Sequence, residues 1–211
     1  MLLPGEVGST AVTLARAKKR NNALVALLCG VAPAIFLSYL RAPDLRHWIV
    51  GLAIGVGWGN AFEYAYHRWL LHWPKSFLGR GHLEHHRTAG GAEQVEHITF
   101  GRNPLNVVAL FLGNGILLFL LEFFLKLQIA PGVLIGWAVY LIVLEEIHWR
   151  LHMESWLPPG LGFARAYHLS HHDIPNTRYN VFFPLFDFLF GDNKLPANAL
   201  VMPSDPSQSS R

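Results

Sequence analysis

Four long stretches with almost no charged residues constrain the fold of this chain more than any other feature of its sequence. They are residues 23–40, 48–66, 105–125 and 131–144. As a helix, the first stretch would reach roughly 27 Å at about 1.5 Å per residue, close to the thickness of a bilayer's hydrocarbon core. Only 15% of the 211 residues are charged, against about 25% in a soluble domain. We therefore expect an all-α integral membrane protein with four transmembrane helices.

The connections between these stretches are short. Residues 41–47 and 126–130 leave room only for turns, so the four helices should form two hairpins. Within the second stretch, Gly51, Gly55 and Gly59 are spaced four apart. This spacing of small residues lets two membrane helices approach each other closely.

The basic residues predict how the chain is oriented in the membrane. Of the 17 Lys and Arg residues, only Arg41, Arg46 and Lys126 fall in the two hairpin turns. Because basic residues concentrate on the cytoplasmic side of membrane proteins, we expect both termini and the region between the hairpins to be cytoplasmic. The expected parts are a cytosolic N-terminal segment (1–22), a membrane domain (23–200) and a polar, disordered tail (201–211). No basic run with interleaved aromatic residues supports a nucleic-acid partner.

The histidines form a second pattern. Ten of the twelve lie in four groups, and each predicted hairpin is followed by a histidine pair and then by an H-x-x-H-H motif. These groups are His67 and His72; His82, His85 and His86; His148 and His152; and His168, His171 and His172. Residues three or four apart are neighbours on one helix face, so each motif can aim two imidazoles at a common point. The spacing of five between His67 and His72 fits worse, and we expect the helix to loosen or end there.

So many imidazoles on one face of the membrane indicate metal binding. Protonated, they would repel one another, whereas neutral imidazole is the commonest metal ligand. The single cysteine, Cys29, lies in an apolar stretch, which leaves nitrogen and oxygen as ligands. One ion takes four to six ligands, so ten histidines indicate two ions. Structural zinc uses four ligands and catalytic zinc three, so two iron ions, which can activate dioxygen, fit better; zinc in the isolated protein is the alternative.

Five further polar residues lie beside the histidine groups. They are Glu63, Glu145, Glu146, Asp173 and His97. Such residues can orient ligand imidazoles by hydrogen bonding to their second ring nitrogen. Ordinary interfacial side chains are the alternative interpretation.

Together, these motifs resemble a known family. EYAYHRWLLH (63–72), HLEHH (82–86), HWRLH (148–152) and HLSHH (168–172) look like the histidine boxes of the fatty acid hydroxylase superfamily, which includes sterol desaturases and carotenoid hydroxylases. Their spacing most resembles the fatty acid 2-hydroxylase branch. The similarity covers roughly residues 45–192 and includes the aromatic ending FPLFDFLFGD (183–192). The resemblance implies that all ten histidines ligate a dinuclear centre, normally di-iron, in a cytosolic helical cap on four membrane helices.

The resemblance also implies an activity, the O2-dependent hydroxylation of an unactivated C–H bond in a lipid or fatty acyl chain. A desaturase or hydroxylase acting on a sterol or carotenoid is the alternative, and a non-catalytic metal-stabilised membrane scaffold is a second. A metal transporter fits poorly, because the spans offer little beyond Cys29, Asn60 and Asn114. No haem, flavin or G-x-G-x-x-G motif is present, so electrons must come from a separate b-type cytochrome, or from a ferredoxin with its reductase.

Overall fold

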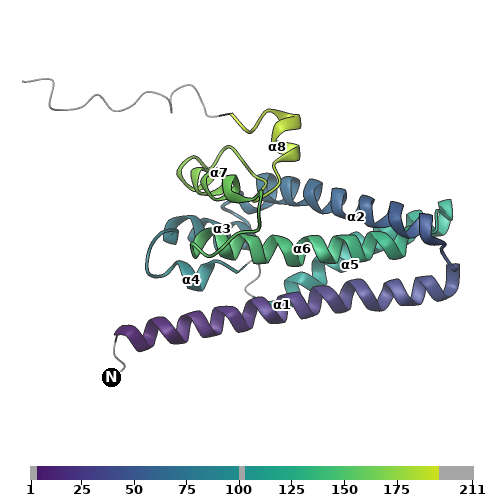
Figure 1. Cartoon of the computed structure of the whole chain (residues 1–211), viewed down its shortest axis with the longest axis horizontal. Coiled ribbons are helices and arrows are strands. Elements are labelled where there is room, and N and C mark those ends of the chain that lie inside the picture. Colours follow the sequence, from purple (N-terminus) through teal and green to yellow (C-terminus); the bar gives the residue numbers. More distant parts are fainter. Residues whose placement is uncertain (1–3, 100–102, 195–211) are drawn as a thin grey trace, which may run out of the picture.

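The computed structural model describes residues 4–99 and 103–194, and within them all regular structure is helical. The elements are α1 (Pro4–Arg41), α2 (Leu45–Tyr66), the π-helical turn η1 (His67–Leu71), α3 (Phe77–Thr88), α4 (Gln94–His97), α5 (Pro104–Leu125), α6 (Ala130–His152), α7 (Gly162–Asp173) and α8 (Leu185–Phe190). The four long helices α1, α2, α5 and α6 run along one another, and the shorter elements gather at one end as a cap (Figure 1). The prediction of an all-α fold is confirmed, whereas the predicted tail 201–211 lies outside the described residues.

Three helices in the described part of the chain are long and apolar enough to cross a membrane. They are Gly8–Arg41, Pro104–Leu125 and Ala130–His152, which contain the first, third and fourth predicted spans. The second predicted span forms α2 but is not among the three, so a fourth crossing stays a prediction. The predicted boundary at residue 22 is not a break in the backbone, because α1 is one continuous helix from Pro4 to Arg41.

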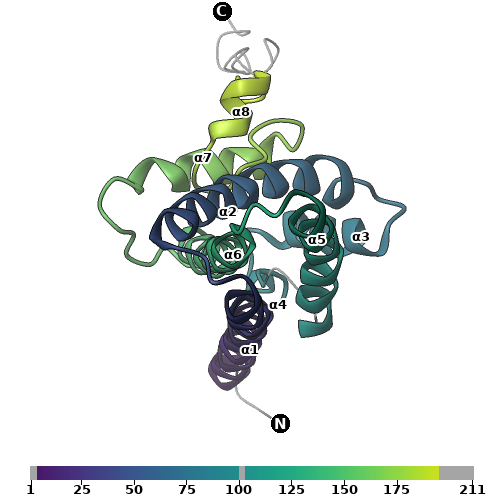
Figure 2. The same ribbon diagram turned by 90° about the vertical axis from the view of Figure 1, so that its right-hand side faces the viewer.

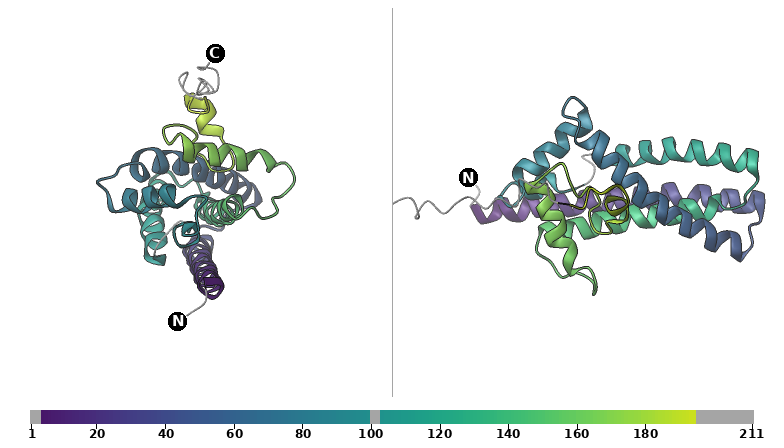
Figure 3. Two further views of the ribbon diagram at one scale, coloured as in Figure 1. Left: turned by 90° about the vertical axis from the view of Figure 1, so that its left-hand side faces the viewer. Right: turned by 90° about the horizontal axis from the view of Figure 1, so that it is seen from above.

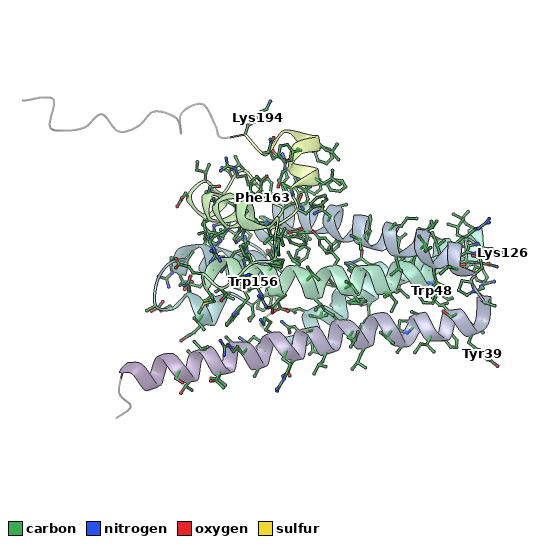
Figure 4. The ribbon with its side chains drawn as sticks, in the orientation of Figure 1. Tyr39, Trp48, Lys126, Trp156, Phe163 and Lys194 are labelled. Carbon is green, nitrogen blue, oxygen red and sulfur yellow. The ribbon has the colours of Figure 1, made fainter. Side chains whose placement is uncertain are left out.

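Local sequence signals explain where the long helices begin and end. Asp44 caps α2 by accepting a hydrogen bond from the His47 backbone N–H at 3.0 Å, and Asn103 caps α5 in the same way. These side chains satisfy backbone donors that have no partner within the helix. Lys126 ends α5 in the left-handed conformation, with φ at 53°. Figure 4 shows Tyr39, Trp48 and Lys126 at one end of the bundle. The cap residues Trp156, Phe163 and Lys194 lie away from that end.

Glycines set the contact between α2 and α6. A Cβ added to Gly51 would lie 2.9 Å from the Cα of Gly132, and one added to Gly55 would lie 3.0 Å from the Cα of Gly136. The first separation is shorter than real Cβ contacts and the second is at their lower limit, so the two backbones approach this closely only because both helices carry glycine at the contact. The predicted close approach of the small-residue face of α2 is confirmed, and the structure identifies its partner on α6.

This contact gives a first testable prediction. We expect Gly55→Val to lower the thermal unfolding temperature in detergent by roughly 5–10 °C, because overpacking a tight contact costs about 1–3 kcal/mol or more. Gly57→Val is the matched control, since a Cβ on Gly57 meets nothing within 4 Å. Equal losses in the two variants would contradict the assigned contact.

Candidate metal centre

All ten histidines of the four predicted groups converge in the cap, where they form two clusters. The first cluster is His67, His72, His82, His86 and His171, and the second is His85, His148, His152, His168 and His172. Within each cluster, the five candidate ligand atoms lie within 4.8 Å of one another. Each cluster could therefore hold one metal ion, which agrees with the prediction of two.

Distances between the ring nitrogens test whether an ion fits. A metal bound to imidazoles at about 2.1 Å places two ligands at right angles about 3.0 Å apart. In the first cluster, His82 Nε2 lies 2.9 Å from His67 Nε2 and 3.0 Å from His86 Nε2. In the second cluster, His168 Nε2 lies 2.9 Å from His152 Nε2 and 3.2 Å from His172 Nε2. The ring nitrogens are thus spaced as ligands that meet a metal ion at right angles, as they do in octahedral coordination.

Each H-x-x-H-H motif supplies both clusters. Residues four apart on a helix are separated by about 40° around its axis, whereas adjacent residues are separated by about 100°. His82 and His86 therefore share the first cluster while His85 joins the second, and in α7 it is His171 that crosses to the first cluster. The rings of His86 and His172 stack with centroids 4.3 Å apart, so the two clusters adjoin.

The helix loosens between His67 and His72, as predicted. Residues His67–Leu71 form a π-helical turn, and the His72 backbone N–H donates to the His67 carbonyl oxygen at 3.2 Å. The extra residue in this turn lets a spacing of five place two side chains on one face. The ring centroids of His67 and His72 are 5.0 Å apart as a result.

Burial keeps the cap histidines neutral. Loss of hydration holds the pKa of His67, His85 and His171 well below its ordinary value, and neighbouring imidazoles lower it further. For the less buried His72 and His86, burial lowers the pKa to about 4. Neutral imidazole is the form that binds metal, so the cap presents lone pairs at neutral pH.

Backbone carbonyls orient several of these rings. His67 Nδ1 donates to the Tyr179 carbonyl oxygen, and His171 Nδ1 donates to the Thr177 carbonyl oxygen at 2.6 Å. His148 is hydrogen bonded to the backbone at Ile98. With Nδ1 as the donor, Nε2 carries the lone pair that faces the cluster. Sequence analysis missed these partners, because a backbone carbonyl leaves no signature in the residue type.

The candidate Glu63 is buried beside the histidines. Its carboxylate accepts hydrogen bonds from the Tyr140 hydroxyl, the Asn180 side chain and the Val181 backbone N–H. It also lines a cavity of about 40 Å³ together with histidines of both clusters, among them His67 and His168. Glu63 therefore joins α2, α6 and the segment after α7 next to the candidate metal centre.

The other four candidates lie in different surroundings. Glu145 accepts a hydrogen bond from Asn22 of α1 at 3.0 Å. Glu146 forms ion pairs with Lys19 and Arg150. Asp173 is exposed at the end of α7. His97 is half-buried and lines a cavity of about 80 Å³ that contains His82, His85 and His148.

That last cavity, which we call the site cavity, reaches both clusters. It lies between α2, α3, α5 and α6, and its lining also includes Tyr66, Leu110 and Asn106. His82 belongs to the first cluster, and His85 and His148 belong to the second. A molecule in the site cavity would thus be next to both candidate metal positions.

Asp187 supports the centre and was not singled out from the sequence. It is fully buried and accepts hydrogen bonds from the backbone N–H groups of Tyr179 and Asn180, both at 2.8 Å, and from the Tyr167 hydroxyl at 3.0 Å. Because the Tyr179 carbonyl orients His67, Asp187 fixes a segment that holds the first cluster. The available signal was the aspartate within the aromatic ending FPLFDFLFGD.

This network gives a second prediction. We expect Asp187→Asn to weaken metal binding about 10- to 100-fold, the usual cost of losing a group that orients a ligand. The measurement is metal retention against a competing chelator. Asp173→Asn is the control, because that carboxylate is exposed, and equal weakening in both variants would argue against the assigned support.

The fold and the site define a class of protein. It is a helical membrane protein with two adjoining histidine clusters that could each hold a metal ion. Comparison with protein families makes this specific, because residues 52–192 match the model of the family described as fatty acid hydroxylase. The match spans more than half of the chain, and the chain belongs to this family. Membership implies oxidoreductase activity. Comparisons with curated proteins and with solved structures give no match.

Proposed function

We propose that the protein is a membrane-bound di-iron oxygenase that hydroxylates an unactivated C–H bond of a lipid or fatty acyl chain. The observation that carries the proposal is the pair of adjoining five-histidine clusters at the end of an apolar helical bundle. The overall reaction consumes one dioxygen, two electrons and two protons, and it gives the hydroxylated chain and one water. A separate b-type cytochrome, or a ferredoxin with its reductase, supplies the electrons.

In this proposal the ten histidines are the ligands, and each cluster holds one iron ion. Iron is preferred to zinc because zinc has no redox chemistry; bound iron would supply the activation of dioxygen. The chain's own residues do the rest. The carbonyls of Tyr179 and Thr177 aim the imidazoles of His67 and His171, and the site cavity positions the C–H bond beside both clusters.

We further propose that α2 is a fourth transmembrane helix, so that α1 with α2 and α5 with α6 form two hairpins. The glycine contact between α2 and α6 supports this arrangement, since it places α2 along a candidate span. The few basic residues at the hairpin turns favour a cytoplasmic cap and cytoplasmic termini. Within the family, the spacing of the histidine boxes favours the fatty acid 2-hydroxylase branch.

The experiment combines metal analysis with turnover. Purified protein should contain about two iron ions per chain and, with dioxygen, a reducing system and lipid extract, should release a lipid with one added oxygen atom that derives from labelled dioxygen. A product that has lost two hydrogens instead would favour desaturation. Less than one metal ion per chain, or full metal content with no lipid product under any electron donor, would remove the proposal in favour of a scaffold.

A further inference from the structure

Helix α5 stands apart from the rest of the bundle. Viewed along the bundle, α2, α6 and α1 are stacked, and α5 lies to one side of them (Figure 2). The view from above shows the same separation (Figure 3). Within α5 only Val107, Phe111 and Glu122 are buried. Most of its apolar surface therefore has no protein partner.

Two apolar grooves flank α5. One, of about 170 Å³, lies between α2 and α5 and is lined by Ile54, Trp58, Asn114, Leu117, Leu121 and Trp137, among others. The second, of about 440 Å³, lies between α1 and α5 and is lined by Cys29, Phe36, Val108, Ile116 and Phe119, among others. We call them the α2–α5 groove and the α1–α5 groove.

A row of aromatic side chains leads from the α2–α5 groove to the site cavity. Trp58, Phe62 and Tyr66 are spaced four apart on α2, so they share one face. Ring centroids are 6.4 Å apart for Trp58 and Phe62, and 5.3 Å apart for Phe62 and Tyr66. Trp58 lines the groove and Tyr66 lines the site cavity. Helix α5 follows the same course, with Leu110 in the cavity and Asn114 one turn away in the groove.

Three aromatic rings stand between the groove and the cavity. Trp137 of α6 lies 5.8 Å from Phe62 of α2 and 4.5 Å from Phe111 of α5, measured between ring centroids. At the groove itself, Trp58 Nε1 donates to Asn114 Oδ1 at 3.1 Å and so ties α5 to α2. Phe62 is half-buried, whereas Trp137 and Phe111 are buried, so Phe62 is the least enclosed ring of the three.

Resting on the proposed function, we propose that the acyl chain of the substrate lies in the α2–α5 groove and that Phe62 sets how far the chain advances into the site cavity. An acyl chain is the occupant that the surroundings select, because the groove is apolar, opens at a surface of the candidate span α5, and is separated from the site cavity only by the aromatic rings named above. The chain then threads past the ring of Phe62 to bring a C–H bond next to both clusters.

The larger α1–α5 groove fits this role less well. Its lining comes from α1, α5 and Leu134 of α6, and α1 contributes no residue to the site cavity. Phe111, which is 5% exposed, lines the α1–α5 groove at the cavity end of α5. A chain in the α1–α5 groove would therefore end against Phe111 and not at the histidines.

Adjacent residues of α5 provide a matched test. Leu117 lines only the α2–α5 groove and Ile116 only the α1–α5 groove, and both are more than half exposed, at 51% and 60%. Leu117→Trp and Ile116→Trp each fill one groove without entering a packed core. The probe is a long-chain fatty acid with a photoreactive diazirine near its methyl end, presented to the metal-loaded protein in phosphatidylcholine nanodiscs.

We expect light to attach the probe to peptides of α2 and α5 that line the α2–α5 groove. Leu117→Trp should reduce this labelling and the turnover of long-chain lipids at least tenfold, whereas Ile116→Trp should leave both close to wild type. Labelling and turnover lost in Ile116→Trp alone, or unchanged in both variants, would overturn the inference. Labelling lost without any effect on turnover would identify a bound structural lipid and would also overturn it.

The role of Phe62 is tested by a measurement that a general loss of structure would not change, namely the position of hydroxylation. We expect Phe62→Leu to shift the position of the new hydroxyl group along the chain, as read by fragmentation of the product. Loss of rate at an unchanged position would contradict the role. Failure of the proposed function is distinguishable, because it abolishes product in every variant while the labelling pattern still reports the groove.

Discussion

Replacing His171 with alanine is expected to lower the iron content to about one ion per chain and to reduce lipid hydroxylation at least a hundredfold. His171 is fully buried, its Nε2 lies 3.2 Å from that of His72, and its ring is oriented by the Thr177 carbonyl. Removing it leaves four of the five candidate ligands of the first cluster, and loss of even a group that orients a ligand weakens metal binding 10- to 100-fold. Metal analysis and product formation give the measurement.

A histidine that lies far from both clusters is the control. His47 lies at the far end of the bundle, where its ring is hydrogen bonded to Asp44, and we expect His47→Ala to keep full metal content and activity. A fully active His171→Ala variant would contradict the assignment of the first cluster.

Double variants test how the motifs divide between the clusters. His85 and His172 both belong to the second cluster, whereas the adjacent His85 and His86 belong to different clusters. Removing His85 with His172 should leave about one tightly bound ion, while removing His85 with His86 should weaken both, because coupling appears between residues that share a partner. The reverse pattern would show that each motif serves a single ion.

Lowering the pH is expected to destabilise the metal-free protein steeply between about pH 6.5 and pH 4. Burial holds the pKa of His72 and His86 at about 4, against 6.5 in an unfolded chain, and lowers the pKa of His172 to about 2. Since these folded-state pKa values are lowered, the unfolded chain binds protons first. Stability is complete above pH 6.5 and falls below it by at most about 1.4 kcal/mol per pH unit for each such histidine.

Thermal unfolding of chelator-treated protein, followed across this pH range, provides the measurement. Metal-loaded protein is the control, because bound ions compete with protons for the same nitrogens and should move the loss of stability to lower pH. An unfolding temperature that stays constant between about pH 7 and pH 5 without metal would be inconsistent with neutral, buried imidazoles.

The features that sequence analysis predicted correctly are those with a local period or a fixed chemistry. The H-x-x-H-H spacing matches a helical face, and the spacing of five from His67 to His72 predicted that the helix loosens there, which the structure shows as a π-helical turn. The spacing of Gly51 and Gly55 predicted a face of α2 that another helix approaches closely. In each case neighbouring residues along the chain carry the whole signal, so no tertiary information was needed.

What the sequence left open depends on contacts between distant segments. The spacing of His85 and His86 does not state that they face different ions, because that follows from where α6 and α7 pack. The carbonyls of Thr177 and Tyr179 carry no residue-specific signal at all. An apolar stretch also does not show whether its side chains pack inside the protein. Both α5 and α6 are long and apolar, but most residues of α6 are buried and few of α5 are.

Each H-x-x-H-H motif contributes histidines to both clusters, and this sharing affects when each cluster can be completed during synthesis of the chain. Four residues of the first cluster, His67 to His86, leave the ribosome early, but its fifth, His171, is among the last parts of the family domain to be made. The second cluster also depends on α7, which supplies His168 and His172. A metal ion held by all five histidines of either cluster would therefore be bound only after α7 has been made, and it would link the beginning of the domain to its end.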